Sequence, residues 1–425
     1  MKNNPEKFDV AVIGGGPAGM LSAGRAAELG ARVILLEKNA QLGRKLLLTG
    51  NGRCNLTNVS DSQPEFIKKL GPRGTFLFSA LASFGPAEVV NFFNQYGLKT
   101  KVEKNGRVFP VTDRSQDVLD CLLKYLKKNN VQVEASMEAS KFNLENGKIQ
   151  SVILKDREIL ADNFILTTGG KSYPATGSTG DGHAWAAALG HQIVQTQPAL
   201  APIKIQEPWV KELQGVSLTG VKITLLQKGK QQKTFSGEII FTHFGLSGPA
   251  IINASKSVGE LLEKGKVELE IDLLFEIDAG NLDKKLAQAF RDLSNKDLKN
   301  YLPELLPEKL SNVIIKLAGI EPKRKLNSIT KEERMSLVKT IKNLNLNVSG
   351  ILGYEQAMVT AGGVALKGVD SKTLRSKIIS NLFFAGEILD LDGPTGGYNL
   401  QIAWSTGYAA GTHAAAGFMR SPRNY

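Results

Sequence analysis

The chain has 425 residues, a length that suits two or three domains rather than one. Hydrophobic residues make up 42% and charged residues 22%, which excludes intrinsic disorder and allows a sizeable core. Two cysteines and four histidines exclude a disulfide framework and a cysteine-rich zinc site, and we expect no metal. The sequence has no apolar stretch of membrane-span length and no signal-peptide pattern at Met1–Lys7. We therefore expect a cytoplasmic protein that does not enter a membrane.

The formal net charge is +12, and most of the excess lies in two stretches. Residues 1–130 hold 19 lysines and arginines against 11 acidic residues, and residues 276–345 hold 14 against 10. A basic surface favours polyanions such as nucleic acid or an anionic membrane face. The alternative is an ordinary solvated surface rich in lysine, and charge alone favours that alternative.

The first elements of the chain form a βαβ unit. Phe8–Ile13 is a short apolar run that predicts a buried parallel strand, and residues 17–29 have small apolar side chains at helical spacing. Gly30 is of the residue type that ends helices, and Arg32–Glu37 is the next expected strand. This pattern predicts the start of a doubly wound α/β sheet.

The same sheet is expected to continue through the next part of the chain. The predicted elements are a helix at 115–128, strands at 131–134 and 163–168, and a helix at 181–190. Asp181 is expected to cap the last of these helices with its carboxylate.

The hydrophobic pattern of the sequence changes near residue 196. Short alternating stretches separated by glycine and lysine turns predict strands at 203–206, 216–228, 234–242 and 266–273. Three or so helices are expected over 279–342, and after about residue 350 the chain returns to glycine-rich apolar strands and a helix of small residues. The sequence thus predicts a nucleotide-binding domain made from both chain ends, with a β-rich and helical insertion at about 196–350.

The turn after the first strand carries the pattern Gly-x-Gly-x-x-Gly at Gly14, Gly16 and Gly19. The first glycine permits a tight turn, the second lets the backbone approach a pyrophosphate, and the third lets helix and strand pack closely. Glu37 ends the next strand 18 residues after Gly19, where a carboxylate accepts hydrogen bonds from a ribose. The motif alone is weak, but its place between a strand and a helix predicts a dinucleotide site.

Three further stretches indicate a flavin nucleotide. Residues 43–58 are rich in Gly, Asn, Thr and Arg and offer donors to a phosphate or an isoalloxazine edge, although a solvated loop is the alternative. Gly169-Gly170 follows a strand and resembles the turn close to the dinucleotide in two-dinucleotide-type flavoproteins. In such proteins an acid placed like Glu387 bonds a ribityl hydroxyl, and a helix that begins near Asn399 would direct its positive end at the flavin. No independent NAD(P) domain is apparent.

By these residues the whole chain resembles the BaiN/RdsA (YhiN-like) family of NAD(P)/FAD-dependent oxidoreductases. The family loop usually reads Ser-Gly-Gly-Gly-Arg-Cys-Asn, whereas this chain has Thr49 for the serine and Asn51 for a glycine. Asn51 therefore adds a side chain near the flavin. The stretches that carry the resemblance are Gly14–Gly19, Gly43–Asn58, Ser172–Gly190, Thr242–Pro249, Val359–Val364 and Gly386–Gln401.

The resemblance implies an α/β fold with a discontinuous Rossmann-like FAD-binding domain of the two-dinucleotide type, an inserted flavoprotein β-barrel and a helical subdomain. The implied boundaries are 1–195 and 358–425 for the FAD-binding domain, 196–277 and 343–357 for the barrel, and 278–342 for the helical subdomain. FAD is the implied cofactor, and NAD(P)H is a candidate transient reductant. The expected FAD contacts are Gly14, Gly16, Pro17, Ala18, Gly19, Glu37, Lys38, Gly43, Arg44, Lys45, Thr49, Gly50, Asn51, Arg53, Cys54, Asn55, Ala139, Thr168, Gly169, Gly170, Gly386, Glu387, Asp392, Gly396, Gly397, Tyr398, Asn399 and Leu400.

The resemblance leaves more than one reaction open. Some members look like ribosomal RNA dihydrouridine synthases, whereas others are bile-acid-type enone reductases or oxidases of small amino ketones. We favour reduction of a uridine of 23S rRNA by hydride transfer from reduced flavin N5, with a small-molecule reductase or an amine or aminoketone oxidase as the alternative. The rRNA partner would suit the basic stretches, including Lys323–Lys325 and the tail residues Arg420 and Arg423. The sequence has no recognisable RNA-binding motif.

Three side chains are candidate catalytic acids. Cys54 lies in the flavin loop, where its thiol would donate a proton or simply pack under the ring. His243 would reach the active-site face or serve as a structural histidine, and Tyr398 would donate from its phenol or pack against the flavin. His183, His191 and Cys121 are expected to be structural.

Overall fold

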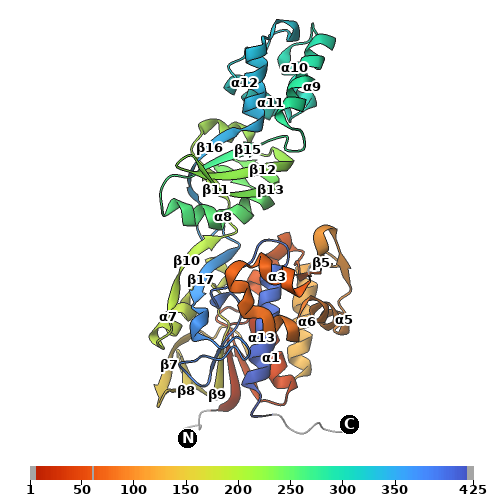
Figure 1. Cartoon of the computed structure of the whole chain (residues 1–425). Coiled ribbons are helices and arrows are strands. Elements are labelled where there is room, and N and C mark those ends of the chain that lie inside the picture. The colour runs from red at the N-terminus through yellow and green to blue at the C-terminus, as the bar shows by residue number, and fades with distance from the viewer. Residues whose placement is uncertain (1–5, 60–61, 419–425) are drawn as a thin grey trace. The chain divides into compact units, whose positions relative to one another are not determined.

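The computed structural model describes residues 6–59 and 62–418 of the chain, so the tail residues Arg420 and Arg423 lie outside the described part. The chain divides into two compact units (Figure 1). Unit 1 combines Met1–Pro198 with Met358–Tyr425, and unit 2 is Ala199–Ala357. The finer assignment of functional domains made from the sequence stays a prediction.

Unit 1 holds a mixed sheet, two smaller sheets and the helices around them. Its strands are β1 (Lys7–Ile13), β2 (Val33–Leu36), β3 (Thr57–Asn58), β4 (Thr100–Val102), β5 (Arg107–Pro110), β6 (Gln132–Glu134), β7 (Ala139–Glu145), β8 (Lys148–Leu154), β9 (Glu158–Leu166), β10 (Ile193–Ala199, which ends at the boundary), β17 (Val359–Val364) and β18 (Leu382–Phe384). Its helices are α1 (Pro17–Glu28), α2 (Arg44–Leu48), α3 (Gln63–Lys69), α4 (Phe78–Ser83), α5 (Pro86–Gln95), α6 (Ser115–Lys128), α7 (Asp181–Ala188) and α13 (Tyr398–Ala414).

The central sheet has the strand order β6-β2-β1-β9-β8-β7, and β18 pairs with β9. β6, β2, β1, β9 and β18 run parallel, whereas β8 pairs antiparallel with β9 and β7 pairs antiparallel with β8. Val12 lies opposite Leu35 on one neighbour and Ile165 on the other, and all three are fully buried. A parallel strand covered on both faces is a continuous apolar run, which is why β1 was recognisable from sequence. The predicted α/β fold with a Rossmann-type sheet is confirmed.

The first and last long helices of unit 1, α1 and α13, pack side by side (Figure 1). Glycines on α13 allow this approach: a Cβ built on Gly407 would lie 2.6 Å from the carbonyl oxygen of Ala18. One built on Gly411 would lie 2.4 Å from the carbonyl oxygen of Ser22. The two chain ends therefore join in one layer, because no side chain separates their backbones.

Unit 2 is a closed barrel followed in sequence by helices. The barrel has the order β11-β14-β13-β12-β15-β16, and its strands are β11 (Ile203–Ile205), β12 (Ser217–Gln227), β13 (Lys230–Thr242), β14 (Gly245–Ser247), β15 (Glu268–Asp272) and β16 (Leu344–Ile351). The helices are α8 (Pro249–Leu262), α9 (Ala279–Asp292), α10 (Leu298–Tyr301), α11 (Glu308–Leu317) and α12 (Lys331–Lys342). Barrel and helices share one apolar core, in which Ile223 and Leu337 are both fully buried.

One local prediction about the elements is wrong. Asp181 does not cap the helix at 181–190, because Gly180 holds the cap position and no side chain bonds the helix end. The Asp181 carboxylate instead accepts hydrogen bonds from Lys38 Nζ at 2.6 Å and from Thr179 Oγ1 at 2.7 Å. A charged donor is a stronger partner for a carboxylate than a backbone amide, so the ion pair takes precedence over the cap.

No single helix among the described residues is long and apolar enough to cross a membrane. The segments Gly71–Ser83 and Pro86–Gln95 meet the same length and composition criteria only as a pair, bent by 41°.

The contact between α1 and α13 yields a stability test. We expect Gly411→Ala to destabilise the protein by about 1–3 kcal/mol, because the new methyl group meets backbone that cannot move aside. Urea unfolding followed by circular dichroism measures this. Gly417→Ala is the matched control, since a Cβ there meets nothing within 4 Å. Equal loss of stability in both variants would show that the helix contact is not the cause.

Candidate functional site

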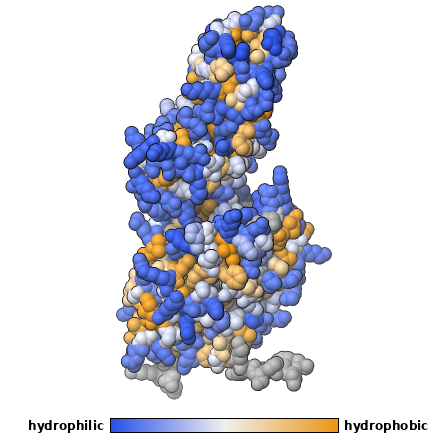
Figure 2. All heavy atoms as spheres, in the orientation of Figure 1, coloured by the Kyte–Doolittle hydropathy of each residue, from blue (hydrophilic) through white to orange (hydrophobic). Residues whose placement is uncertain are grey.

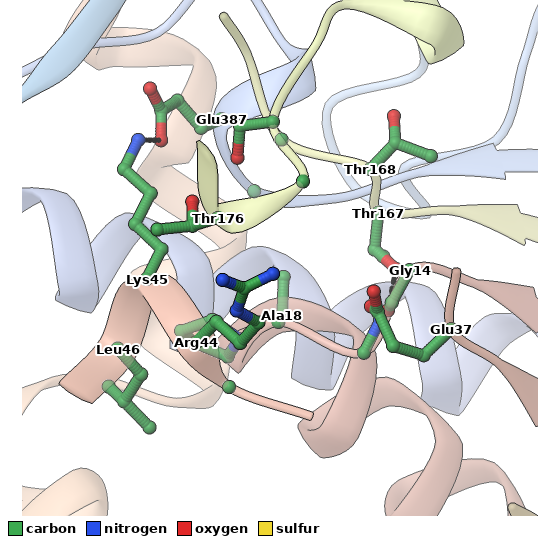
Figure 3. A pocket seen from close by; sticks show the side chains of 18 of the residues that line it. Gly14, Ala18, Glu37, Arg44, Lys45, Leu46, Thr167, Thr168, Thr176 and Glu387 are labelled. Atoms are coloured by element: carbon green, nitrogen blue, oxygen red, sulfur yellow. Dashed lines mark hydrogen bonds and ion pairs between the residues drawn. The ribbon is translucent and has the colours of Figure 1, made fainter. Parts of the chain in front are cut away.

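A pocket opens in unit 1 where three strands of the central sheet end (Figure 3). Ile13 and Leu36, the last residues of β1 and β2, line it together with Thr167, which follows β9. The space in and around the pocket, open solvent included, is about 1270 Å³. Ligands of open α/β sheets bind outside the carboxyl ends of the strands, so this is the expected place for a large ligand.

The turn between β1 and α1 has the geometry that its glycines predict. Gly14 has φ +109°, and a Cβ on it would lie 2.6 Å from the carbonyl oxygen of Thr167. A Cβ on Gly19 would lie 1.8 Å from the carbonyl oxygen of Gly14. A Cβ on Gly16, by contrast, would meet nothing within 4 Å. Gly14 and Gly19 are thus required by packing, whereas Gly16 leaves open space beside the pocket that it lines.

The amino end of α1 is available for an anion. Gly16 is the cap residue, no side chain caps the helix, and Pro17 takes the first position. The first turn contains no acidic residue, so no carboxylate there bonds the free amides or repels an anionic ligand. Backbone amides at a helix start have no partner within the helix, and the helix dipole adds positive potential, so a phosphate is the ligand that this end favours.

Glu37 lies at the end of β2 and is buried with its carboxylate facing the glycine turn. Its Oε2 accepts a hydrogen bond from the Gly15 amide at 2.7 Å, and its Oε1 accepts two from the backbone and side-chain nitrogens of Asn39 at 2.8 and 2.6 Å. A carboxylate has about four acceptor positions, so capacity remains for a hydroxyl donor. The position at the end of β2 is where a ribose hydroxyl is bound in Rossmann folds.

Two of the basic residues predicted to bind cofactor have protein partners. Lys38 pairs with Asp181 and also donates to Thr179. Arg44 donates to Asn39 Oδ1 at 2.9 Å and is exposed. Both residues still line the pocket.

A second ion pair links the two halves of unit 1 at the pocket. Lys45 Nζ of α2 lies 2.7 Å from Glu387 Oε2, in the turn after β18, and Figure 3 shows the two side chains pointing toward each other. The Thr360 amide donates to the other oxygen of Glu387 at 2.8 Å. Thr360 Oγ1 in turn accepts hydrogen bonds from the amides of Lys171 and Ser172. Glu387 is therefore bonded by two segments that are distant in sequence, and Thr360 connects it to a third.

The amino end of α13 reaches the same pocket. Gly397 with φ +100° is its cap, no acidic residue lies in its first turn, and Asn399 and Leu400 line the pocket. The side chain of Asn399 accepts from the Gly393 amide at 2.8 Å and donates to the Gly393 carbonyl at 2.9 Å. Asn399 thus fixes the loop before the helix, so the helix end itself is the positive group directed to the pocket.

The structure brings most of the predicted contact residues together around the pocket. Those that line it are Gly14, Gly16, Pro17, Ala18, Glu37, Lys38, Gly43, Arg44, Lys45, Thr49, Ala139, Thr168, Gly169, Gly386, Glu387, Asn399 and Leu400. Those that do not are Gly19, Gly50, Asn51, Arg53, Cys54, Asn55, Gly170, Asp392, Gly396, Gly397 and Tyr398. The lining residues that sequence reasoning missed include Asn39, Gln41, Met137, Glu138, Thr176, Ser178, Trp185, Met358 and Leu391. Thr176, Ser178, Trp185 and Leu391 lie in stretches that carry the family resemblance, whereas the other five lie in no motif.

The predicted residues outside the lining have structural reasons for their positions. Gly50 and Asn51 form an exposed turn in the left-handed region, with φ +57° and +56°, a conformation that asparagine tolerates better than most residues. Gly170 is required by packing, since a Cβ there would lie 2.4 Å from Thr360 Oγ1. Their roles as cofactor contacts stay predictions.

Cys54 is completely buried and does not line the pocket. Burial raises the pKa of its thiol to about 12, while a hydrogen bond with Thr49 acts in the opposite direction. The thiol therefore keeps its proton at neutral pH but is removed from solvent. A catalytic role for Cys54 stays a prediction.

The other two candidate acids lie in different surroundings. The Tyr398 ring packs against Phe66 with centroids 4.7 Å apart, and its hydroxyl accepts a hydrogen bond from Lys69 Nζ at 3.0 Å. Its phenol is thus engaged by α3. His243 is exposed between β13 and β14 of unit 2. Neither lines the pocket of unit 1, and both roles stay predictions.

The buried histidines have structural bonds. His183 Nε2 donates to the Ile388 carbonyl at 3.1 Å, and His191 Nε2 lies 2.8 Å from Ser376 Oγ. Burial lowers the pKa of both rings. Across residues 6–59 and 62–418, no group of three or more His, Cys, Asp or Glu side chains is placed to hold a metal ion.

The fold and the pocket together define a protein of the Rossmann type with a site suited to a dinucleotide. A family model described as the HI0933-like protein Rossmann domain matches residues 8–413. The chain belongs to this family.

Proteins similar to this chain over nearly its whole length include two reducing enzymes. The chain is 31% identical over 418 residues to a 3-dehydro-bile acid delta(4,6)-reductase of Clostridium scindens, covering 96% of this chain and 98% of that protein. It is 30% identical over 406 residues to a ribosomal RNA dihydrouridine synthase of Escherichia coli K12, covering 95% and 97%. A solved structure of 3-ketosteroid-Δ4-(5α)-dehydrogenase from Rhodococcus jostii RHA1 matches with a TM-score of 0.55 at 18% identity, covering 98% of each chain, which shows a shared fold.

The residues of the pocket fit FAD. Gly16 leaves space where a Cβ would stand, and the amino ends of α1 and α13 bring two positive helix ends without acidic neighbours to one pocket. Glu37 offers an acceptor at the ribose position. With the family established, the chain is an FAD-dependent oxidoreductase, and the expected cofactor is confirmed.

Gly16→Ala separates cofactor binding from folding. We expect unchanged thermal stability, because the added Cβ meets nothing within 4 Å and the residue has an ordinary φ of −79°. We expect FAD affinity to fall by about tenfold or more, about 1.4 kcal/mol, because the methyl group occupies the side from which a pyrophosphate approaches. Titration of the apoprotein with FAD measures the affinity, and Gly417→Ala is the control. Wild-type affinity in Gly16→Ala would contradict the assigned phosphate site.

The buried thiol of Cys54 yields a pH prediction. The folded thiol ionises near pH 12 instead of its ordinary 9.0. Below pH 9 both states keep the proton, so the contribution to stability is constant, and it is lost as pH rises from about 9 to 12 because the unfolded thiol ionises first. Urea unfolding between pH 8 and 11 should show a steeper decline for wild type than for Cys54→Ala. Parallel declines would contradict the burial of this thiol.

Proposed function

We propose that this protein reduces a uridine of 23S ribosomal RNA to dihydrouridine in the cytoplasm. The observation that carries the proposal is the full-length similarity to two ribosomal RNA dihydrouridine synthases, at 30% identity over 95% of the chain and 31% over 94%. The net charge of +12 supports a polyanionic partner.

The chemistry is a conjugate reduction. The C5=C6 bond of uracil gains a hydride at C6 and a proton at C5, while the C4 carbonyl accepts electron density. When bound, FAD supplies the two-electron hydride donor at N5, and NAD(P)H is the candidate reductant that restores it. A base inside a folded RNA must be unstacked to reach such a centre, which proteins achieve with single-stranded or extruded nucleotides.

The chain's own residues bind and orient the cofactor for this reaction. The start of α1 would hold the pyrophosphate, and Glu37 would accept hydrogen bonds from hydroxyl groups of the adenosine ribose. Glu387, fixed by Lys45 and Thr360, stands at the position expected for a ribityl contact, and the amino end of α13 adds positive potential nearby. We propose Cys54, Tyr398 and His243 as the candidate proton donors, and the raised pKa of Cys54 keeps its thiol protonated at neutral pH.

A second candidate function is reduction of a small enone. It is favoured by the 31% identity to the 3-dehydro-bile acid delta(4,6)-reductase over nearly the whole chain. Both substrates contain a C=C bond conjugated to a carbonyl, so the same pocket chemistry serves either. Oxidation of an amine or aminoketone is a third candidate reaction. It differs from the two reductions because the reduced flavin would pass its electrons to oxygen.

Nucleoside mass spectrometry of ribosomal RNA tests the proposal. Deletion of the gene should abolish one dihydrouridine of 23S rRNA, and the intact gene should restore it. The purified FAD-loaded protein with NAD(P)H should form dihydrouridine in rRNA from the deletion strain, whereas Gly16→Ala should form much less because it loses cofactor.

Two outcomes would point elsewhere. Unchanged dihydrouridine in the deletion strain, with rapid turnover of a steroid-like enone, would establish the small-molecule reductase. Fast reoxidation of the reduced protein in air without RNA would favour an oxidase.

A further inference from the structure

A small basic sheet adjoins the pocket through a short piece of chain. Thr49 lines the pocket, and the turn Thr49–Gly52 leads through Arg53 into β3, which pairs with β5 and then β4. Four residues of chain span at most about 14 Å, so Arg53 lies within that distance of Thr49. The turn is closed by hydrogen bonds from the Arg53 amide to the Gly50 carbonyl and from the Cys54 amide to the Thr49 carbonyl. β3 also lies against the start of α13, since a Cβ on Gly397 would lie 2.5 Å from the Thr57 carbonyl oxygen, so the sheet is held close to the pocket within unit 1.

This sheet has a concentrated positive charge. Its acidic residues in the range 99–114 are Glu103 and Asp113 only. The cations of the same range together with Arg53 are Arg53, Lys99, Lys101, Lys104, Arg107 and Arg114. We call these six cations and the strands β3, β5 and β4 the basic sheet.

Both acidic residues are already occupied. Asp113 Oδ1 lies 2.6 Å from Arg53 Nη2, and Asp113 Oδ2 lies 2.6 Å from Lys101 Nζ. Glu103 also pairs with Arg53. Hydrogen bonds from Lys101 and Arg53 lower the pKa of Asp113, so the pairs persist at neutral pH. Lys99, Lys104 and Arg107 make no ion pair with any described residue, which leaves their charges for a ligand.

Apolar and planar groups lie among these charges. Val102 and Val111 are 63% and 51% exposed. The Arg53 guanidinium lies 4.0 Å from the centre of the Phe109 ring, which fixes its plane. Around β5, Figure 2 shows hydrophilic and hydrophobic residues side by side on the surface. Single-stranded nucleic acid is bound by this combination, since cations contact phosphates while bases rest on apolar or planar groups.

We propose that the basic sheet is the surface on which a single-stranded segment of ribosomal RNA docks, so that the adjoining nucleotide reaches the pocket. The inference rests on the proposed function and adds its partner surface. An anionic membrane matches the charge but not the fixed guanidinium plane or the distance to the pocket, so RNA is the occupant that the features together favour.

Removal of the three cations that make no ion pair with a described residue, none of which lines the pocket, tests this surface. We expect Lys99→Ala/Lys104→Ala/Arg107→Ala to raise the Kd for protein-free 23S rRNA by about 100-fold at 0.1 M salt and to reduce the salt slope by about 2. The FAD-loaded protein is used, and its flavin absorbance should be unchanged. Dihydrouridine formation should show a raised KM for RNA and an unchanged kcat, which distinguishes weaker docking from damaged chemistry.

The matched control removes three exposed lysines of the barrel, Lys228→Ala/Lys230→Ala/Lys264→Ala. An equal loss of binding in this control would overturn the inference, because net charge alone would then account for the attraction. Binding to vesicles of anionic lipid without binding to rRNA would overturn it as well. If wild type binds rRNA through this surface but forms no dihydrouridine, the proposed function fails and the docking surface stands. If wild type forms dihydrouridine and the triple variant matches the control, the surface fails and the function stands.

Discussion

The turn between β1 and α1 is the constraint on which the rest of unit 1 depends. A Cβ on Gly19 would overlap the Gly14 carbonyl, and a Cβ on Gly14 would overlap the Thr167 carbonyl. Backbone from β1, α1 and the end of β9 thus meets without side chains between them. This contact places the start of α1 at the edge of the sheet, where its unpaired amides face the pocket. Glycines also replace larger side chains where α13 meets α1. This close packing brings the amino end of α13 to the same pocket as the amino end of α1.

The pocket combines the two ends of the chain through charge as well as packing. Lys45 belongs to the N-terminal part and Glu387 to the C-terminal part, and their ion pair is only partly exposed. Thr360 extends this network: its amide donates a hydrogen bond to Glu387, and its hydroxyl oxygen accepts hydrogen bonds from the amides of Lys171 and Ser172. Residues distant in sequence thus form one polar network at the pocket, and in such networks the members act together rather than as independent contacts.

The sequence predicted the parts of the fold that local rules determine. The strand at Phe8–Ile13 and the helix at 115–128 follow from apolar runs and helical spacing, and the structure has β1 and α6 there. Four of the six barrel strands were found from alternation, although the strand predicted at 234–242 begins earlier, at Lys230. The other two, β14 and β16, were not predicted. The strands β4 and β5 were not predicted, because they are three and four residues long and pair only through tertiary contact.

The candidate site also has parts that the sequence predicted and parts that it did not. Glycines and acids at strand ends were predictable, because backbone approach and charge require those residue types. The partner of Asp181 was not, because Lys38 is 143 residues away in the chain. The lining residue Met137 is an apolar side chain of a kind common in pocket walls, and no motif marks it. The engagement of Tyr398 by Lys69 and the burial of Cys54 likewise depend on the packing of α3 and α13, which local sequence does not express.

The pairing of β10 with β17 places the two connections between unit 1 and unit 2 side by side. The Ala365 amide bonds the Gln192 carbonyl, and Gly362 lies against Gln195, so the strands run antiparallel and the residues at the unit boundary fall opposite one another. Unit 2 therefore departs from and returns to unit 1 at points separated by about one strand spacing, roughly 5 Å. An insertion with such closely spaced ends can be gained, lost or exchanged without rerouting the host chain. Unit 1 can in this sense carry different inserted units without a change in its own fold.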